Sequence, residues 1–113
     1  MFDEPTSPPL IPLTMRASVE TFSQDTQGWP LATPGDRPEQ ARSFRTRIHF
    51  ATPFTGVPVV QVALTGFDID KHHTARIEVR TESITPDGFD LLIGTWQDTR
   101  VYQVSVGWLA LGH

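Results

Sequence analysis

Apolar and polar side chains alternate along much of the chain with a period of two. Residues 43–50 (SFRTRIHF) place Phe, Thr and Ile at every second position, with Arg or His between them. Residues 74–82 (TARIEVRTE) repeat the pattern, and their polar side consists of Arg76, Glu78, Arg80 and Glu82. Such alternation is typical of strands that bury one face, whereas a helix repeats every 3.6 residues. We therefore predict two half-buried strands here.

Four further segments have the composition of strands. They are residues 15–22, 57–67, 88–96 and 101–109. Residues 57–67 (VPVVQVALTGF) are longer and more apolar than the others, as expected of a central strand, with Pro58 near the start because proline cannot donate to a sheet ladder. Turn-forming residues separate the segments, and none shows helical periodicity. The sequence therefore predicts an all-β fold in one domain, a six-stranded antiparallel β-sandwich.

The N-terminal segment differs from the rest and is rich in proline. It carries Pro5, Pro8, Pro9 and Pro12, and it has acidic residues where a signal peptide has Lys or Arg. No apolar run approaches the roughly 18 residues that cross a bilayer. We expect residues 1–13 to be an arm or linker before a domain at 14–113, and the chain to be soluble, with neither an export signal nor membrane insertion. A frayed end, a lead from another domain and a contact with a neighbouring subunit all fit the arm, and the sequence assigns no cellular location.

The composition of the chain excludes several classes of function. The chain has 113 residues, a net charge of −4 and no long basic run, so nucleic acid is not an expected partner. The absence of Cys excludes disulfides, thiolate metal sites and a Cys nucleophile. The four His lack the spacing of metal ligands, and the 13 acidic residues form no local pair suited to acid–base chemistry. The sequence thus predicts a protein that is not an enzyme and holds neither a metal nor a cofactor.

The charged side of residues 74–82 has two interpretations. It fits a solvated face, and it also fits a face that meets sister subunits, because alternating signs can pair across a symmetric interface. Two of the Trp residues have a simpler assignment. We expect Trp29 to pack structurally, and Trp108 to lie in the core because it is in phase with Val104 and Val106.

One ordered set of motifs goes beyond composition. Its segments are FATPFTGVPVVQVALTGFD (50–68), ARIEVRTESITPDGF (75–89) and TWQDTRVYQVSVGWLALG (95–112). Together they resemble the H-type lectin domain, the family of the snail agglutinins and of the C-terminal domain of the discoidins. The resemblance covers about residues 16–110. Each motif is weak alone, but the collinear set is fairly specific.

The resemblance implies a function and an assembly. It implies a six-stranded sandwich that forms a homotrimer and binds glycans with terminal N-acetylgalactosamine (GalNAc) or galactose at sites between subunits, as in cell adhesion. Two trimers can stack into a hexamer, here without disulfide links because the chain has no Cys. Such a lectin meets extracellular or cell-surface ligands. The alternative is a structural or protein-interaction module that uses the same trimeric scaffold without binding sugar.

The resemblance also assigns site residues. Arg76, Trp96 and Tyr102 fall on the sugar-binding arginine, tryptophan and tyrosine of the family, and Gln97 stands where the snail protein has His. Trp and Tyr offer a flat apolar area with a polar tip, and Arg donates hydrogen bonds in a fixed fork. These are the groups that a sugar ring and its hydroxyls require.

The Gly-x-Asp loop of the family is harder to place on this chain. Gly35 and Asp36 are its best candidates by residue type, whereas Glu39 fits better by counting back from Phe50. A carboxylate there can accept from two neighbouring hydroxyls.

The spacing of Trp96 and Tyr102 creates a conflict. If residues 97–100 form a regular four-residue hairpin loop, Trp96 pairs with Val101, and Tyr102 points to the opposite face. We therefore predict a longer loop, a bulge, or a Trp96 that lies beyond the end of its strand.

Overall fold

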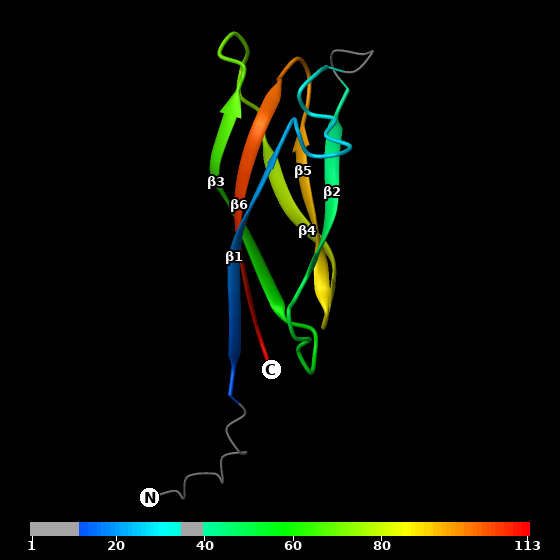
Figure 1. Cartoon of the computed structure of the whole chain (residues 1–113), viewed down its shortest axis with the longest axis vertical. Coiled ribbons are helices and arrows are strands. Elements are labelled where there is room, and N and C mark those ends of the chain that lie inside the picture. The colour runs from blue at the N-terminus through cyan, green and yellow to red at the C-terminus, as the bar shows by residue number, and fades with distance from the viewer. Residues whose placement is uncertain (1–11, 35–39) are drawn as a thin grey trace, which may run out of the picture.

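Six β-strands make up the regular structure of the protein (Figure 1). The computed structural model describes residues 12–34 and 40–113, and within these ranges it contains no helix. The strands are β1 (Thr14–Ser23), β2 (Arg42–His49), β3 (Val59–Ile69), β4 (Glu78–Thr85), β5 (Gly88–Thr95) and β6 (Val101–Gly112). All six predicted strands are confirmed. The largest difference in bounds is at β4, which begins at Glu78 rather than at residue 74.

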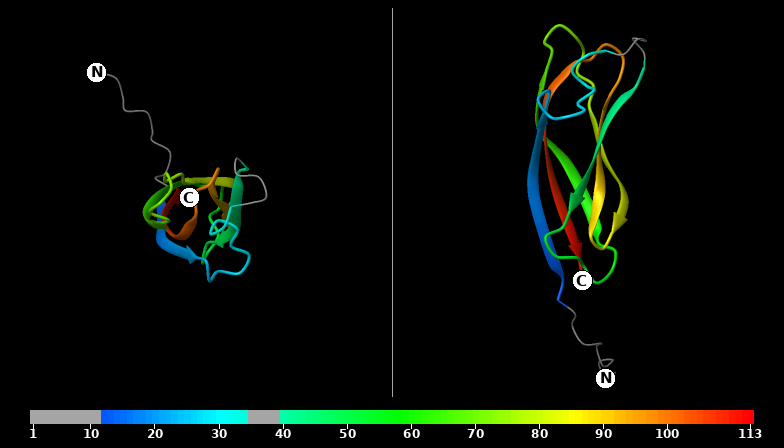
Figure 2. Two further views of the ribbon diagram at one scale, coloured as in Figure 1. Left: turned by 90° about the horizontal axis from the view of Figure 1, so that it is seen from above. Right: turned by 45° about the vertical axis from the view of Figure 1, so that its right-hand side comes forward.

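The strands form two antiparallel sheets stacked face to face (Figures 1 and 2). The strand order is β1-β6-β3 in one sheet and β2-β5-β4 in the other. This confirms the predicted antiparallel sandwich. β5 and β6 belong to different sheets, so the hairpin considered for them from the sequence is wrong. Residues 96–100 instead cross from one sheet to the other.

β3 is an edge strand, and the expectation that residues 57–67 form a central strand is therefore wrong. The central strand of that sheet is β6, which pairs with β1 on one side and with β3 on the other. β3 carries apolar residues on both of its sides although it lies at the edge of the sheet. Val60 and Val62 pack on the core, whereas Val59 points outward and is 66% exposed.

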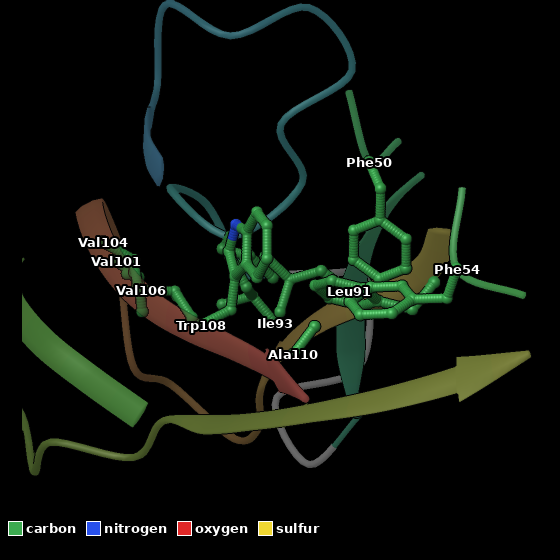
Figure 3. Packing of buried hydrophobic residues seen from close by; sticks show 11 residues of the cluster. Phe50, Phe54, Leu91, Ile93, Val101, Val104, Val106, Trp108 and Ala110 are labelled. Atoms are coloured by element: carbon green, nitrogen blue, oxygen red, sulfur yellow. The ribbon is translucent and has the colours of Figure 1, made fainter. Parts of the chain in front are cut away.

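The core lies between the sheets and is filled by inward residues of the two central strands (Figure 3). β5 contributes Phe89, Leu91 and Ile93, and β6 contributes Val104, Val106, Trp108 and Ala110. Each fully buried side chain of this kind stabilises the fold by about 1.5–3 kcal/mol. Trp108 is 8% exposed and meets the Phe89 ring edge-on at 5.5 Å, so its predicted core position is confirmed.

The outer face of the β2-β5-β4 sheet, here the charged face, carries Arg45, Arg47, Glu78, Arg80, Glu82 and Asp90. Arg45 bridges strands by bonding Glu82 of β4 at 2.5 Å and Asp90 of β5 at 2.7 Å. Arg80 lies 3.2 Å from Glu78 and 3.6 Å from Glu82. These charges are therefore paired within one protomer.

The outer face of the β1-β6-β3 sheet, here the apolar face, is different. One row across the three strands is Met15, Leu111 and Val59, and the next is Ala17, Leu109 and Gln61. Met15 is 66% exposed, and Leu109 and Leu111 are 37% and 38% exposed. This face presents a band of uncharged, largely apolar side chains to its surroundings.

Candidate functional site

Of the predicted site residues that the structure describes, Arg76, Trp96 and Gln97 lie in connections at one end of the sandwich, and Tyr102 is the second residue of β6. The β1–β2, β3–β4 and β5–β6 connections all reach this end, opposite the C-terminus (Figure 1). Backbone hydrogen bonds tie them together, from the Val101 amide to the Leu31 carbonyl at 2.7 Å and from the Asp70 amide to the Arg100 carbonyl at 3.0 Å. Gly35, Asp36 and Glu39 belong to the first connection but lie outside the described residues.

Arg76 is held in place by the β5–β6 connection. Its Nη1 donates to Asp98 Oδ1 and to Thr99 Oγ1, both at 3.0 Å. Thr95 Oγ1 donates to the Arg76 carbonyl at 2.5 Å, so the backbone is fixed as well. Arg76 precedes β4, and its guanidinium reaches this connection rather than Glu78 or Glu82 of the same charged segment. The guanidinium instead joins the Asp98–Thr99 segment.

Thr99 is the buried centre of this arrangement. Its side chain is completely buried, and its hydroxyl accepts from Arg76 while donating to the Thr74 carbonyl at 2.6 Å. A buried hydroxyl with both partners fixes their relative position, since losing either bond would leave a polar group unsatisfied. Sequence analysis did not single out Thr99, because a Thr in a turn segment has no distinguishing signal.

Trp96 lies just past the end of β5, which confirms the predicted irregularity. β5 ends at Thr95, and Gln97 has a φ of +56°, an uncommon conformation for a residue with a side chain. The chain therefore turns sharply after Trp96, whose side chain is 37% exposed rather than part of the core. It lines the outer side of the β2-β5-β4 sheet together with Gly94 and Leu92.

Tyr102 lies on the other sheet. In the pairing of β3 with β6, Asp68 faces Gln103 and Ile69 faces Val101, so Tyr102 falls within a register shift. A bulge of this kind redirects a side chain without ending the strand. Trp96 and Tyr102 thus belong to opposite sheets, and one strand face does not present both. The structure joins Arg76 to Asp98 and Thr99 of the β5–β6 connection, and it places Tyr102 on β6 of the other sheet.

Arg42 connects the loops that flank the site, and sequence analysis missed it. Its Nη1 donates to the carbonyls of Leu31 at 3.3 Å and Thr33 at 2.6 Å. Its Nη2 donates to the carbonyls of Gln97 at 3.0 Å and Thr99 at 2.6 Å. Burial, and next the cation of Arg100, lowers the pKa of Arg42. One guanidinium therefore cross-links the β1–β2 and β5–β6 connections.

Trp29 packs at the same end of the sandwich, and its contacts confirm the structural role predicted for it. Its Nε1 donates to the Val101 carbonyl at 2.9 Å, and its ring packs on Phe44 with centroids 5.1 Å apart.

Known proteins show the same sequence pattern and the same fold. The sequence model of the H-type lectin domain matches residues 45–111, which is more than half of the chain. The chain belongs to the H-type lectin family. The domain is therefore of a carbohydrate-binding, non-enzymatic class.

Two comparisons place this H-type lectin domain among known proteins. A curated protein of Fuscovulum blasticum, described as ATP synthase subunits region ORF 7, is 41% identical over 71 residues, which are 63% of this chain and 62% of that protein. The recombinant native structure of discoidin II from Dictyostelium discoideum superposes with a TM-score of 0.72 at 23% identity, covering 88% of this chain and 36% of that chain. The wild-type structure of discoidin II gives 0.73 at 22%, covering 89% and 37%. This chain thus spans about a third of discoidin II, and the likeness shows the fold.

Two further findings concern the surroundings of the lectin site. Across the part of the chain that the structure describes, no group of three or more His, Cys, Asp or Glu is arranged to hold a metal ion. In the same residues no helix is long and apolar enough to cross a membrane. Asp98, which accepts from Arg76, also lies 3.9 Å from His73 Nε2, and His73 Nδ1 lies 2.9 Å from Asp70 Oδ2.

Proposed function

We propose that this lectin domain binds terminal GalNAc or galactose-like sugars at sites between the subunits of a homotrimer. The proposal rests on the exposed Trp96 ring and on the Arg76 guanidinium, which Asp98 and Thr99 of the same β5–β6 connection hold in place. A sugar ring packs its C–H face on an aromatic ring, and its hydroxyls accept from a preorganised donor. Holding Arg76 before the ligand arrives lowers the entropy lost on binding.

The division of site residues between two sheets supports a shared site. Trp96 follows β5 and Tyr102 belongs to β6 of the other sheet. In a ring of subunits, Trp96 of one protomer and Tyr102 of its neighbour can therefore face the same sugar. Gln97 provides an amide in place of a His and keeps a hydrogen-bonding group there. Gly35 and Asp36 complete the proposed set as the acceptor loop.

The apolar face is the proposed contact between subunits. Met15, Leu109 and Val59 expose 66%, 37% and 66% of their surface, more apolar area in one band than a solvated face needs. The charges of the other face are already paired within the protomer, which supports the interpretation that it is solvated. Several sites facing one way gain avidity of roughly 10²–10⁴ over a single site.

A thermal shift experiment tests the proposal. GalNAc at about ten times its Kd stabilises the folded state by about 1.4 kcal/mol, a rise of about 5 °C in Tm. Trp96→Ala should remove this rise, measured against the Tm of the same variant without sugar, because Trp96 is 37% exposed and its loss also removes some packing. Trp96→Phe is the matched control and should keep part of the rise, since it retains an apolar ring.

A glycan array decides between the proposal and its alternative. If the wild-type protein binds no sugar at high loading, the structural or interaction module is the better explanation. If light scattering shows a monomer, the site between subunits is wrong, whatever the array reports.

A further inference from the structure

The charged face is hollowed directly beside Trp96. A groove of about 190 Å³ begins at Trp96 and runs over Gly94 and Leu92 of β5. The β4 side is formed by Glu78 and Arg80, and the β2 side by Ser43 with Arg42. The groove therefore lies on the sheet surface, just below the ring proposed to hold the terminal sugar.

Gly94 keeps this groove open. It lies in the middle strand of the sheet, opposite Ser43 of β2 and Glu78 of β4, and the pairing continues past it without a register shift on the β2 side. A Cβ added at Gly94 would come no closer than 3.7 Å to another heavy atom, the Arg42 carbonyl oxygen. Neither a bulge nor a close backbone contact thus requires glycine here. A glycine inside a strand weakens the sheet, and such a glycine often marks the approach of a ligand.

The groove has an apolar floor and neutralised sides. Leu92 points to the outer face yet is only 5% exposed, so it forms a floor rather than a protruding side chain. The Arg80 guanidinium is paired with Glu78 and Glu82, and the four carbonyls that bind Arg42 occupy both of its terminal nitrogens. An anionic sugar would have to displace existing partners of these cations. A neutral ring would find apolar contact on the floor and hydroxyl partners at Ser43 and the exposed Glu78.

We propose that this groove is a second subsite, which takes the neutral sugar residue linked to the terminal sugar held at Trp96. The subsite rests on the proposed function, because its position is useful only if Trp96 holds a sugar. An oligosaccharide would then extend from the end of the sandwich along the outer side of β5. The lectin would bind two sugar residues of a glycan rather than one.

Gly94→Val tests the subsite by filling the groove. The probes are galactose and GalNAc, and a panel of neutral disaccharides that end in each of them through α and β links. The wild-type protein should bind at least one disaccharide about ten-fold more tightly than its monosaccharide, the equivalent of about one net hydrogen bond. Gly94→Val should reduce this disaccharide to the monosaccharide affinity and leave the Kd of the monosaccharide itself unchanged.

The matched control is Gly56→Val, in the β2–β3 connection, where an added Cβ meets nothing within 4 Å. It should keep the full disaccharide gain. Circular dichroism and Tm establish that both variants fold, and a β-branched residue at position 94 suits a strand.

The failures of the two proposals are distinguishable. If monosaccharides bind but no disaccharide binds more tightly, or if Gly94→Val keeps the gain, the subsite is wrong and the proposed function stands. If neither monosaccharide nor disaccharide binds, both are wrong.

Discussion

The two outer faces of the sandwich are built from equally regular strands but carry opposite chemistry. On the charged face, Arg45 links Glu82 and Asp90 across three strands, and each charge has a partner in the same protomer. On the apolar face, the corresponding row of three strands is Met15, Leu111 and Val59. The first face pairs its charges within one chain. The second face leaves apolar side chains in contact with water.

The difference shows that alternation alone does not define a face. Alternation requires only that one side of a strand is buried, and both sheets meet that requirement with the shared core. The core does not restrict which residues point outward. These residues can therefore be charged and solvated, or apolar and suited to contact with another molecule. Exposed apolar bands on soluble proteins usually mark interaction sites. The apolar face therefore has the character of a subunit contact, and the charged face that of a solvated surface bearing a groove.

The largest effect should follow from a charge placed on the apolar face. Leu109 lies on the central strand of that face between Ala17 and Gln61, so Leu109→Glu would bury an unpaired carboxylate in the proposed subunit contact. We expect the proposed trimer to dissociate into monomers in analytical ultracentrifugation.

Arg80→Glu is the matched control, because it places a carboxylate on the charged face. It should leave the assembly unchanged. If Arg80→Glu separates the subunits and Leu109→Glu does not, the charged face is the interface, the other possibility that the sequence left open.

β3 shows a limit of predicting the fold from sequence patterns. Residues 57–67 were predicted to be a central strand because they are longer and more apolar than the other segments. β3 is an edge strand instead, with Val60 on the core and Val59 exposed on the apolar face. Apolar residues on both sides of a strand therefore do not by themselves place it in the middle of a sheet.

The site shows a similar limit. The conflict between Trp96 and Tyr102 predicted an irregularity, and the end of β5 before Trp96 confirms one. The hairpin that produced the conflict is absent because pairing partners follow from tertiary packing, which periodicity does not report. Arg42 was not predictable, since all four of its acceptors are backbone carbonyls of distant loops. Its sequence context does not distinguish it from Arg45.

A smaller effect should distinguish two arginines of the charged face. Arg47 donates to the Ser83 carbonyl at 2.7 Å and to Thr85 Oγ1 at 2.6 Å, and it lies 3.2 Å from Asp90, so it fixes the irregular end of β4. Its side chain is 28% exposed. Arg47→Met should therefore lower the free energy of unfolding by about 1–2 kcal/mol, measured by urea denaturation.

Arg80→Met is the control for this prediction. The Arg80 side chain is 56% exposed and makes only the ion pairs with Glu78 and Glu82. Exposed pairs of this kind contribute about 0–1 kcal/mol. Equal losses for the two variants would contradict the distinction between a cross-linking arginine and a solvated one.

The smallest effect should appear in acid, at Asp90 of the charged face. Hydrogen bonds from Arg47, then from Arg45, lower the pKa of Asp90 despite some desolvation. A carboxylate whose pKa is lower in the folded state contributes stability above its unfolded pKa of about 3.9, and loses it as pH falls through the folded value. The Tm difference between wild-type protein and Asp90→Asn should thus be constant from pH 5 to 7 and shrink below about pH 4. A difference for Asp90→Asn that stays constant down to pH 2 would mean that the ion pairs of this face do not contribute to the stability of the fold.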